Sequence, residues 1–225
     1  MALYCGAIWS QRLALATDRP ATRRPYVLLF LILIVAPMSE PLPNPLLMNP
    51  SNTVLLVIDM QEKLLPSIAD RERIVWNTRR LLDGAEILGI PALGTEQYRK
   101  GLGATVEPLA AKLGEMPDKL QFSSCQAIAA KLEELNRPKI ILAGIEAHVC
   151  VQQTALDLLS LGYDVYLAAD AVGARFSHDL EFALRRMEST GVTLTTTEAA
   201  LFEWCRVAGT PQFKQISQLV REASP

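Results

Sequence analysis

A regular alternation of short apolar runs and longer amphipathic segments, beginning at Thr53, most constrains the fold of this chain. The run "TVLLVID" at residues 53–59 is almost wholly apolar and rich in β-branched residues, which is typical of a strand buried on both faces. Helical spacing follows over residues 71–88, and Gly89 is expected to end that helix. The same reasoning predicts strands at residues 90–95, 118–121, 139–145, 164–170 and 192–197, and helices at residues 123–136, 149–161, 178–189, 198–207 and 212–222.

Strands that alternate with helices in this way predict right-handed βαβ crossovers and a parallel sheet covered on both faces. We therefore expect an α/β fold, a three-layer α/β/α Rossmann-like domain with a six-stranded parallel sheet in the order 3-2-1-4-5-6. The glycine-rich turn of dinucleotide-binding domains does not follow the first strand, where "DMQEKL" stands instead. No cofactor is expected.

The first fifty residues differ from the rest, so we divide the chain into an N-terminal extension at 1–50 and a folded domain at 51–225. Arg23 and Arg24 precede an apolar run at residues 26–36, which is too short to cross a membrane but fits the hydrophobic part of a signal peptide. Three interpretations stay open. The extension is a spurious start upstream of Met38, a real signal or anchor, or a disordered or locally ordered element.

The net charge and the numbers of cysteines and histidines exclude some classes of function. The net charge is −2 and charged residues of both signs are interspersed, so we expect no nucleic-acid partner, and no membrane contact for the folded domain. The four cysteines form no CxxC pair, which favours reduced thiols and a cytoplasmic location. With only two histidines, a His-rich metal site is excluded.

The expected topology brings two reactive side chains together. In open parallel sheets the active site lies beyond the carboxyl ends of the strands, near the switch in strand order. Asp59 ends the first strand and Cys150 follows the strand at 139–145, so the two should face each other across one crevice. A cysteine at a helix start can be a nucleophile, although a small core residue is the alternative. Asp59 can accept a proton or cap a loop.

Lys119, at the end of the expected third strand, is the candidate cation of this crevice. There it would keep Asp59 ionised, lower the pKa of Cys150 and stabilise negative charge on a reacting carbonyl group. A solvated surface lysine is the alternative, and Lys112 or Lys100 could point inward in its place.

Several sequence blocks occur in a characteristic order between Thr53 and Pro225. They are "LLVIDMQEKLL", "TEQYRKGLG", "DKLQFSS", "GIEAHVCVQQTALDLLSLGYDV", "DAVGAR" and "TTTEAALFE". In these blocks the chain resembles the isochorismatase-like cysteine hydrolases, which include nicotinamidases, N-carbamoylsarcosine amidase and isochorismatases. "TEQYRKGLG" and the ending "PQFKQISQLVRE" are most similar to the subgroup of isochorismatase domain-containing proteins 1 and 2.

The resemblance implies a catalytic triad of Asp59, Lys119 and Cys150 that hydrolyses a C–N, amide-type bond of a small molecule through a thioester on Cys150. It also implies a cis peptide bond between Ile145 and Glu146, and an oxyanion hole built from the backbone N–H groups of Glu146 and Cys150. Relatives assemble as dimers to octamers, so a homo-oligomer is expected.

Departures from the family limit what carries over. Nicotinamidases bind a metal through an Asp and two His after the second strand, but "GTEQYRKGLG" has no histidine, so no metal is expected. True isochorismatases lack the nucleophilic cysteine, so Cys150 favours C–N hydrolysis. An isochorismate-type hydrolase and a non-catalytic binding protein remain the alternatives. Arg99 replaces the usual Pro of relatives and is either an anion contact or a surface change, and His148 is expected to pack at the rim.

Overall fold

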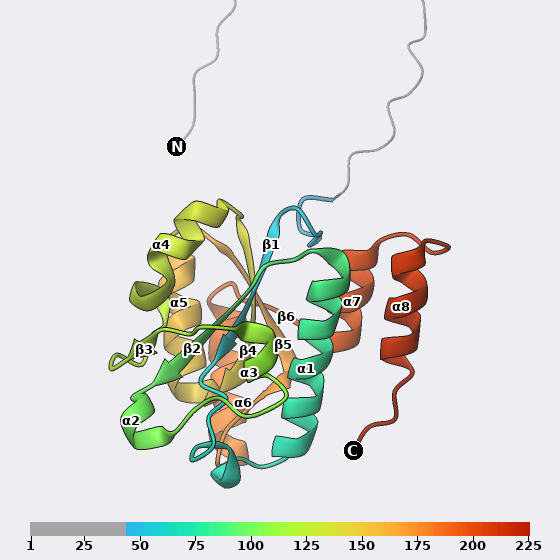
Figure 1. Ribbon diagram of the computed structural model, residues 1–225. Coiled ribbons are helices and arrows are strands. Elements are labelled where there is room, and N and C mark those ends of the chain that lie inside the picture. Colours follow the sequence, from blue (N-terminus) through green and yellow to red (C-terminus); the bar gives the residue numbers. More distant parts are fainter. Residues whose placement is uncertain (1–43) are drawn as a thin grey trace, which may run out of the picture. The chain divides into compact units, whose positions relative to one another are not determined.

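The computed structural model describes residues 44–225, which fold around a six-stranded parallel sheet (Figure 1). The strand order is β3-β2-β1-β4-β5-β6, which confirms the predicted topology. All five neighbouring pairs are parallel. The strands are β1 (Thr53–Ile58), β2 (Ala92–Gln97), β3 (Asp118–Lys119), β4 (Lys139–Ile145), β5 (Asp164–Gly173) and β6 (Thr193–Thr195).

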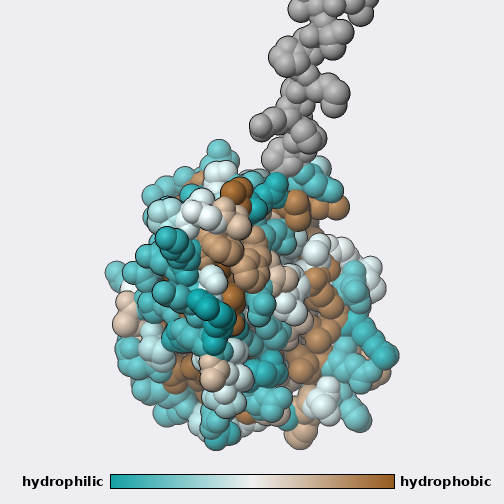
Figure 2. All heavy atoms as spheres, turned by 90° about the vertical axis from the view of Figure 1, so that its right-hand side faces the viewer, coloured by the Kyte–Doolittle hydropathy of each residue, from teal (hydrophilic) through white to brown (hydrophobic). Residues whose placement is uncertain are grey.

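Helices cover both faces of the sheet, as the alternation predicts. Helices α1, α7 and α8 lie on one side in Figure 1, and α4, α5 and α6 lie on the other. Figure 2 views the molecule from the side of α7 and α8, where hydrophobic residues lie among hydrophilic ones. The helices are η1 (Leu65–Ser67), α1 (Arg71–Leu88), α2 (Arg99–Leu102), α3 (Ala110–Leu113), α4 (Cys125–Leu135), η2 (Ala147–Val151), α5 (Gln152–Ser160), α6 (Ser177–Ser189), α7 (Thr197–Cys205) and α8 (Pro211–Val220).

Strand β1 shows why the sequence specifies a three-layer fold. Every residue of β1 is buried, and successive side chains point to opposite faces of a strand. Leu55 and Val57 therefore join the core under α1, while Val54, Leu56 and Ile58 join the core under α4 and α5. An almost continuous apolar run thus supplies both layers of the core at once.

The close pairing of β1 with β4 depends on Gly144. This residue has φ of +125° and lies opposite Ile58 in the strand register. A Cβ atom built on Gly144 would lie 2.1 Å from the carbonyl oxygen of Ile58, a distance that no side chain could tolerate. Only glycine therefore fits where β4 approaches the turn that carries Cys150.

Several elements near the carboxyl edge of the sheet end at other residues than predicted. Strand β2 continues to Gln97 instead of ending at residue 95, and β3 ends at Lys119 instead of residue 121. The helix expected from residue 149 begins with η2, a π-helical turn at Ala147–Val151, before α5 takes over. Strand β5 continues to Gly173 instead of ending at residue 170, because a shift in its register with β4 after Leu142 lets the pairing resume at Val172.

Part of the predicted N-terminal extension packs on the domain. Met48 is fully buried, and its N–H group donates to Glu203 Oε1 on α7 at 2.5 Å. The apolar run at 26–36 and the rest of the extension before residue 44 lie outside the described residues. Within residues 44–225, no helix combines the length and the apolar character needed to cross a membrane.

Candidate active site

Asp59 and Lys119 form an ion pair that is almost completely excluded from solvent. Asp59 follows β1 directly, and its left-handed backbone (φ of +53°) turns the chain at the edge of the sheet. Lys119 ends β3 and reaches across β2, so that its Nζ lies 2.7 Å from Asp59 Oδ2. The side chains of Lys119 and Asp59 are 4% and 0% exposed, respectively. The structure thus brings Asp59 and Lys119 together at one edge of the sheet. Their shared role in catalysis stays a prediction.

The ammonium group of Lys119 is fully occupied by groups of the protein. Besides Asp59, it has Gln97 Oε1 at 2.7 Å, the Phe122 carbonyl oxygen at 2.9 Å and the Gln121 carbonyl oxygen at 3.3 Å. An ammonium has three protons to donate, so these acceptors leave none for a bound ligand. The arrangement suits Lys119 to hold Asp59 and leaves no proton of the ammonium for a hydrogen bond to a reacting carbonyl group.

The other two lysines considered from the sequence lie elsewhere. Lys112 Nζ pairs with Asp83 Oδ1 at 2.6 Å and with Glu86 Oε2 at 3.0 Å, both on α1. Lys100 is exposed on α2. Lys119 is therefore the lysine that faces Asp59.

Cys150 lies in the π-helical turn η2 and is only 5% exposed. Burial, and next the negative charge of Asp59, raise the pKa of the Cys150 thiol to about 12, while Lys119 acts in the opposite direction. The expectation of a lowered pKa is therefore wrong, because desolvation outweighs the cation. At neutral pH the sulfur holds its proton, and a nucleophilic Cys150 would need a neighbouring base.

Asp59 has the properties of that base. Burial raises the pKa of its carboxyl group, and the charge of Lys119 and hydrogen bonds from Lys119, Cys150 and Thr95 act in the opposite direction. A carboxylate with a raised pKa accepts a proton more readily than an ordinary one. The thiol and the carboxylate therefore form a pair in which the proton rests on sulfur and the acceptor stands beside it.

A buried set of hydroxyl groups also belongs to this site, and it was not predicted from the sequence. Thr95 Oγ1 lies 2.9 Å from Asp59 Oδ1 and 3.0 Å from Ser124 Oγ. Ser124 is the residue before α4, but its hydroxyl group does not cap that helix. The one available signal was that Thr95 ends a predicted strand next to that of Asp59.

The turn before Cys150 has one of the two backbone features that the resemblance implies. The peptide bond between Ile145 and Glu146 is cis, as expected. The Glu146 side chain is held by Arg175, whose Nε lies 3.0 Å from Glu146 Oε2. His148 Nε2 lies 3.7 Å from Asp179 Oδ2 on α6, which agrees with a packing position.

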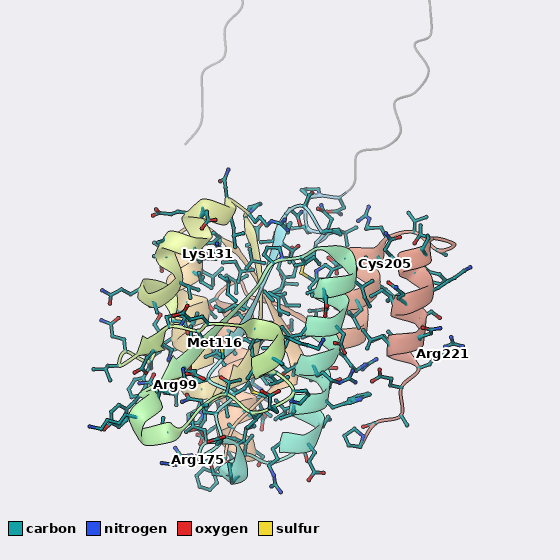
Figure 3. The ribbon with its side chains drawn as sticks, in the orientation of Figure 1. Arg99, Met116, Lys131, Arg175, Cys205 and Arg221 are labelled. Atoms are coloured by element: carbon teal, nitrogen blue, oxygen red, sulfur yellow. The ribbon has the colours of Figure 1, made fainter. Side chains whose placement is uncertain are left out.

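Arg99 makes a contact that neither sequence interpretation included. Its Nε lies 3.2 Å from Oε2 of Glu96, a carboxylate that is almost fully buried in β2. Figure 3 shows Arg99 and Arg175 near the same end of the molecule, the end at which the parallel strands terminate. Each of these half-exposed arginines is thus paired with a buried glutamate at the carboxyl edge of the sheet.

Two further observations concern Asp170 of β5 and possible metal ligands. Asp170, one strand beyond β4, accepts hydrogen bonds from the backbone N–H and the hydroxyl group of Thr197, so it positions the start of α7. Among residues 44–225, no group of three or more His, Cys, Asp or Glu side chains is arranged to hold a metal ion.

The fold and the site define a doubly wound α/β protein with a cysteine, a carboxylate and a lysine at the switch of its parallel sheet. The family model of the isochorismatase domain matches residues 53–199, and the chain belongs to the isochorismatase family.

Two relatives and a solved structure cover most of the chain. Isochorismatase domain-containing protein 2 from Danio rerio is 42% identical over 180 residues, which are 79% of this chain and 91% of the relative. Isochorismatase domain-containing protein 1 from Salmo salar is 40% identical, and the match spans 78% of this chain but 63% of that longer relative. The structure of the MAR1 ribonuclease from Caenorhabditis elegans is 42% identical with a TM-score of 0.75, over 79% of this chain and 94% of that one.

Proposed function

We propose that the protein is a metal-independent cysteine hydrolase that cleaves a C–N, amide-type bond of a small molecule. The observation that carries this proposal is the buried Asp59–Lys119 ion pair beside the thiol of Cys150. A buried charge pair is expensive to retain for stability alone, and a nucleophile next to a base is the usual arrangement for covalent catalysis.

In the proposed first half-reaction, the sulfur of Cys150 attacks the carbonyl carbon while the thiol proton passes to Asp59. The oxyanion that forms would be held by the backbone N–H groups of Glu146 and Cys150. Asp59 then gives its proton to the departing nitrogen, the C–N bond breaks and a thioester remains on Cys150. Lys119 keeps the Asp59 carboxylate oriented throughout.

In the second half-reaction, water attacks the thioester carbonyl and gives a proton to Asp59. The C–S bond breaks, the acid product leaves, and the sulfur recovers its proton from Asp59. The raised pKa of Cys150 favours this last step, because a basic thiolate readily takes the proton back.

The direct test is a panel of small amides and carboximides incubated with the wild-type protein and with Cys150→Ala. Turnover by the wild type and none by the folded Cys150→Ala variant supports the proposal. Turnover that survives Cys150→Ala but is lost in Asp59→Ala and Lys119→Ala would favour an isochorismate-type reaction instead. A wild-type protein that binds panel members without turning them over would favour a binding protein.

RNA hydrolysis is a second candidate, because the MAR1 ribonuclease from Caenorhabditis elegans is 42% identical to the chain. Proteins bind RNA phosphates mainly through clustered Lys and Arg, yet here the net charge is −2 and the cationic residues are interspersed. A labelled RNA in the same assay decides between the two. Cleavage that requires Cys150 and exceeds turnover of every amide would replace the small-molecule proposal.

A further inference from the structure

A chain of hydrogen bonds connects the carboxylate of Asp59 with the backbone of Cys150. Thr95 Oγ1 lies 2.9 Å from Asp59 Oδ1, and Ser124 Oγ lies 3.0 Å from Thr95 Oγ1. The backbone N–H of Ser124 donates to Thr154 Oγ1 at 2.9 Å, and the Thr154 hydroxyl donates to the carbonyl oxygen of Cys150 at 2.7 Å. The three hydroxyl residues are almost completely buried.

The direction of each hydroxyl proton follows from the chemistry of the groups. An ionised carboxylate only accepts hydrogen bonds, so the Thr95 hydroxyl donates to Asp59. A hydroxyl group has a single proton, so Thr95 can only accept from Ser124, whose hydroxyl is therefore the donor of that bond. Ser124 thus donates to Thr95, and Thr95 donates to Asp59.

These bonds complete the anchoring of the carboxylate. Lys119 holds Oδ2 of Asp59 and Thr95 holds Oδ1, so neither oxygen can rotate away without losing a buried partner. Ser124 fixes the rotation of the Thr95 hydroxyl and, through its backbone N–H, contacts the residue that also holds the Cys150 carbonyl. The base and the turn of the nucleophile are therefore linked through the residue that precedes α4.

We infer that Thr95 and Ser124 are positioning residues that, through Oδ1, hold the Asp59 carboxylate in place to receive the proton of Cys150. This inference rests on the proposed function, since it concerns the same proton transfer. A role in packing alone would affect stability, whereas this role also stabilises the ionised form of the carboxylate and so changes the pH at which the base works.

The test follows alkylation of Cys150 by iodoacetamide from pH 4 to pH 9, with peptide mass spectrometry separating Cys150 from the other cysteines. In the full-length wild-type chain, the alkylation rate of Cys150 is expected to fall towards low pH as Asp59 takes up a proton. We call this falling part of the pH profile the acid limb. Thr95→Val removes a donor to the carboxylate, so this acid limb is expected to move to higher pH. At a pH below the limb, Cys150 should react about three- to tenfold more slowly than in the wild type. Ser124→Ala should shift the limb in the same direction by less.

Two variants are matched controls. Thr95→Ser keeps the hydroxyl and should restore the wild-type limb. Thr78→Val also removes a buried threonine hydroxyl, one that donates to the Ile74 carbonyl oxygen within α1 at 2.8 Å. This variant should leave the acid limb unchanged. The inference is overturned if Thr95→Val and Ser124→Ala both follow the wild-type profile. Should Thr95→Val fail to fold, an unshifted Ser124→Ala profile overturns it alone.

Asp59→Asn separates failure of the inference from failure of the proposed function. If the acid limb is unchanged in Asp59→Asn, Asp59 is not the base of Cys150, and the proposed function fails with it. If the limb disappears in Asp59→Asn but is not shifted in Thr95→Val or Ser124→Ala, Asp59 remains the base and only the positioning role is lost.

Discussion

Lys119 Nζ lies 2.7 Å from Asp59 Oδ2, and both side chains are almost entirely shielded from water. The pair joins the ends of two strands, β1 and β3, that are separated by β2 in the sheet. Three other acceptors complete the surroundings of the ammonium group. Asp59 is thereby oriented beside Cys150 by a cation that has no proton to spare for a ligand.

Removing the cation should destabilise the fold strongly. Lys119→Met keeps the length of the side chain but leaves the Asp59 carboxylate buried without its partner, so urea unfolding should show a loss of about 3–5 kcal/mol. The double variant Asp59→Asn/Lys119→Met should recover much of this loss. Lys131→Met, which breaks an exposed pair with Glu134, should change the free energy of unfolding by less than about 1 kcal/mol. Equal losses in the two single variants would contradict the structure.

The raised pKa of Cys150 predicts a stability change in alkali. The folded protein keeps the thiol protonated up to a pKa of about 12, whereas the unfolded chain loses the proton near 9.0. Cys150 thus contributes stability below pH 9 that is lost as the pH rises towards 12. Between pH 8 and pH 10.5, the wild type should lose up to about 2 kcal/mol more than Cys150→Ser. Parallel losses in the two proteins would show that Cys150 is not desolvated.

The raised pKa of Asp59 predicts a loss of activity in acid. Asp59 works as a base only when it is ionised, and its pKa is raised by burial. As the pH is lowered, activity should therefore begin to decline above the pH range in which an ordinary aspartate titrates.

The raised pKa of the Asp59 carboxyl group also affects folding. It adds stability at low pH that is lost as the pH rises through the folded-state pKa. Asp59→Asn should remove that loss, which unfolding curves at pH 4 and pH 7 can measure.

Gly144→Ala should disrupt the sheet beside the site. The added methyl group would lie 2.1 Å from the Ile58 carbonyl oxygen, in a backbone conformation that side chains rarely adopt. A loss of at least about 3 kcal/mol in unfolding free energy is expected, since backbone and not a flexible side chain must move. Gly162→Ala also has a positive φ, of +88°, but meets nothing within 4 Å, so it should lose only about 1 kcal/mol. Similar losses would mean that β1 and β4 do not approach each other so closely.

Arg99 should stabilise the protein by neutralising Glu96. Arg99→Ala removes the ion-pair partner of that buried carboxylate, whose other oxygen accepts from the N–H of Thr105, so a loss of about 1–3 kcal/mol is expected. Arg185→Ala breaks an exposed pair with Glu181 on α6 and should have an effect below about 0.5 kcal/mol. If the two arginine variants are equally stable, Arg99 is merely a surface residue.

The sequence predicted the sheet and the pairing of Asp59 with Cys150, because strand order and the rule for carboxyl ends require only the positions of apolar runs. It did not predict the contacts that occupy Lys119 and Arg99. Their directions depend on side chains of β2, namely Gln97 and Glu96, whose burial becomes visible only once the strands are assembled.

The raised pKa of Cys150 could not be predicted from the sequence either. A helix start and a nearby lysine both favour a thiolate, and both are visible in the sequence. The degree of desolvation is not, and here it outweighs those contributions. The buried hydroxyl groups of Thr95 and Ser124 were not predicted for a similar reason, because threonine and serine at element ends are usually explained by capping.

The thioester on Cys150 is the central claim, and mass spectrometry tests it most directly. Turnover of the best amide of the panel is quenched in acid and the peptide that contains Cys150 is analysed for added mass. We expect the mass of the acyl group on Cys150 in the wild type and its absence in Asp59→Asn. Turnover that continues in Cys150→Ala, with no adduct on the wild-type Cys150 peptide, would rule out the thioester.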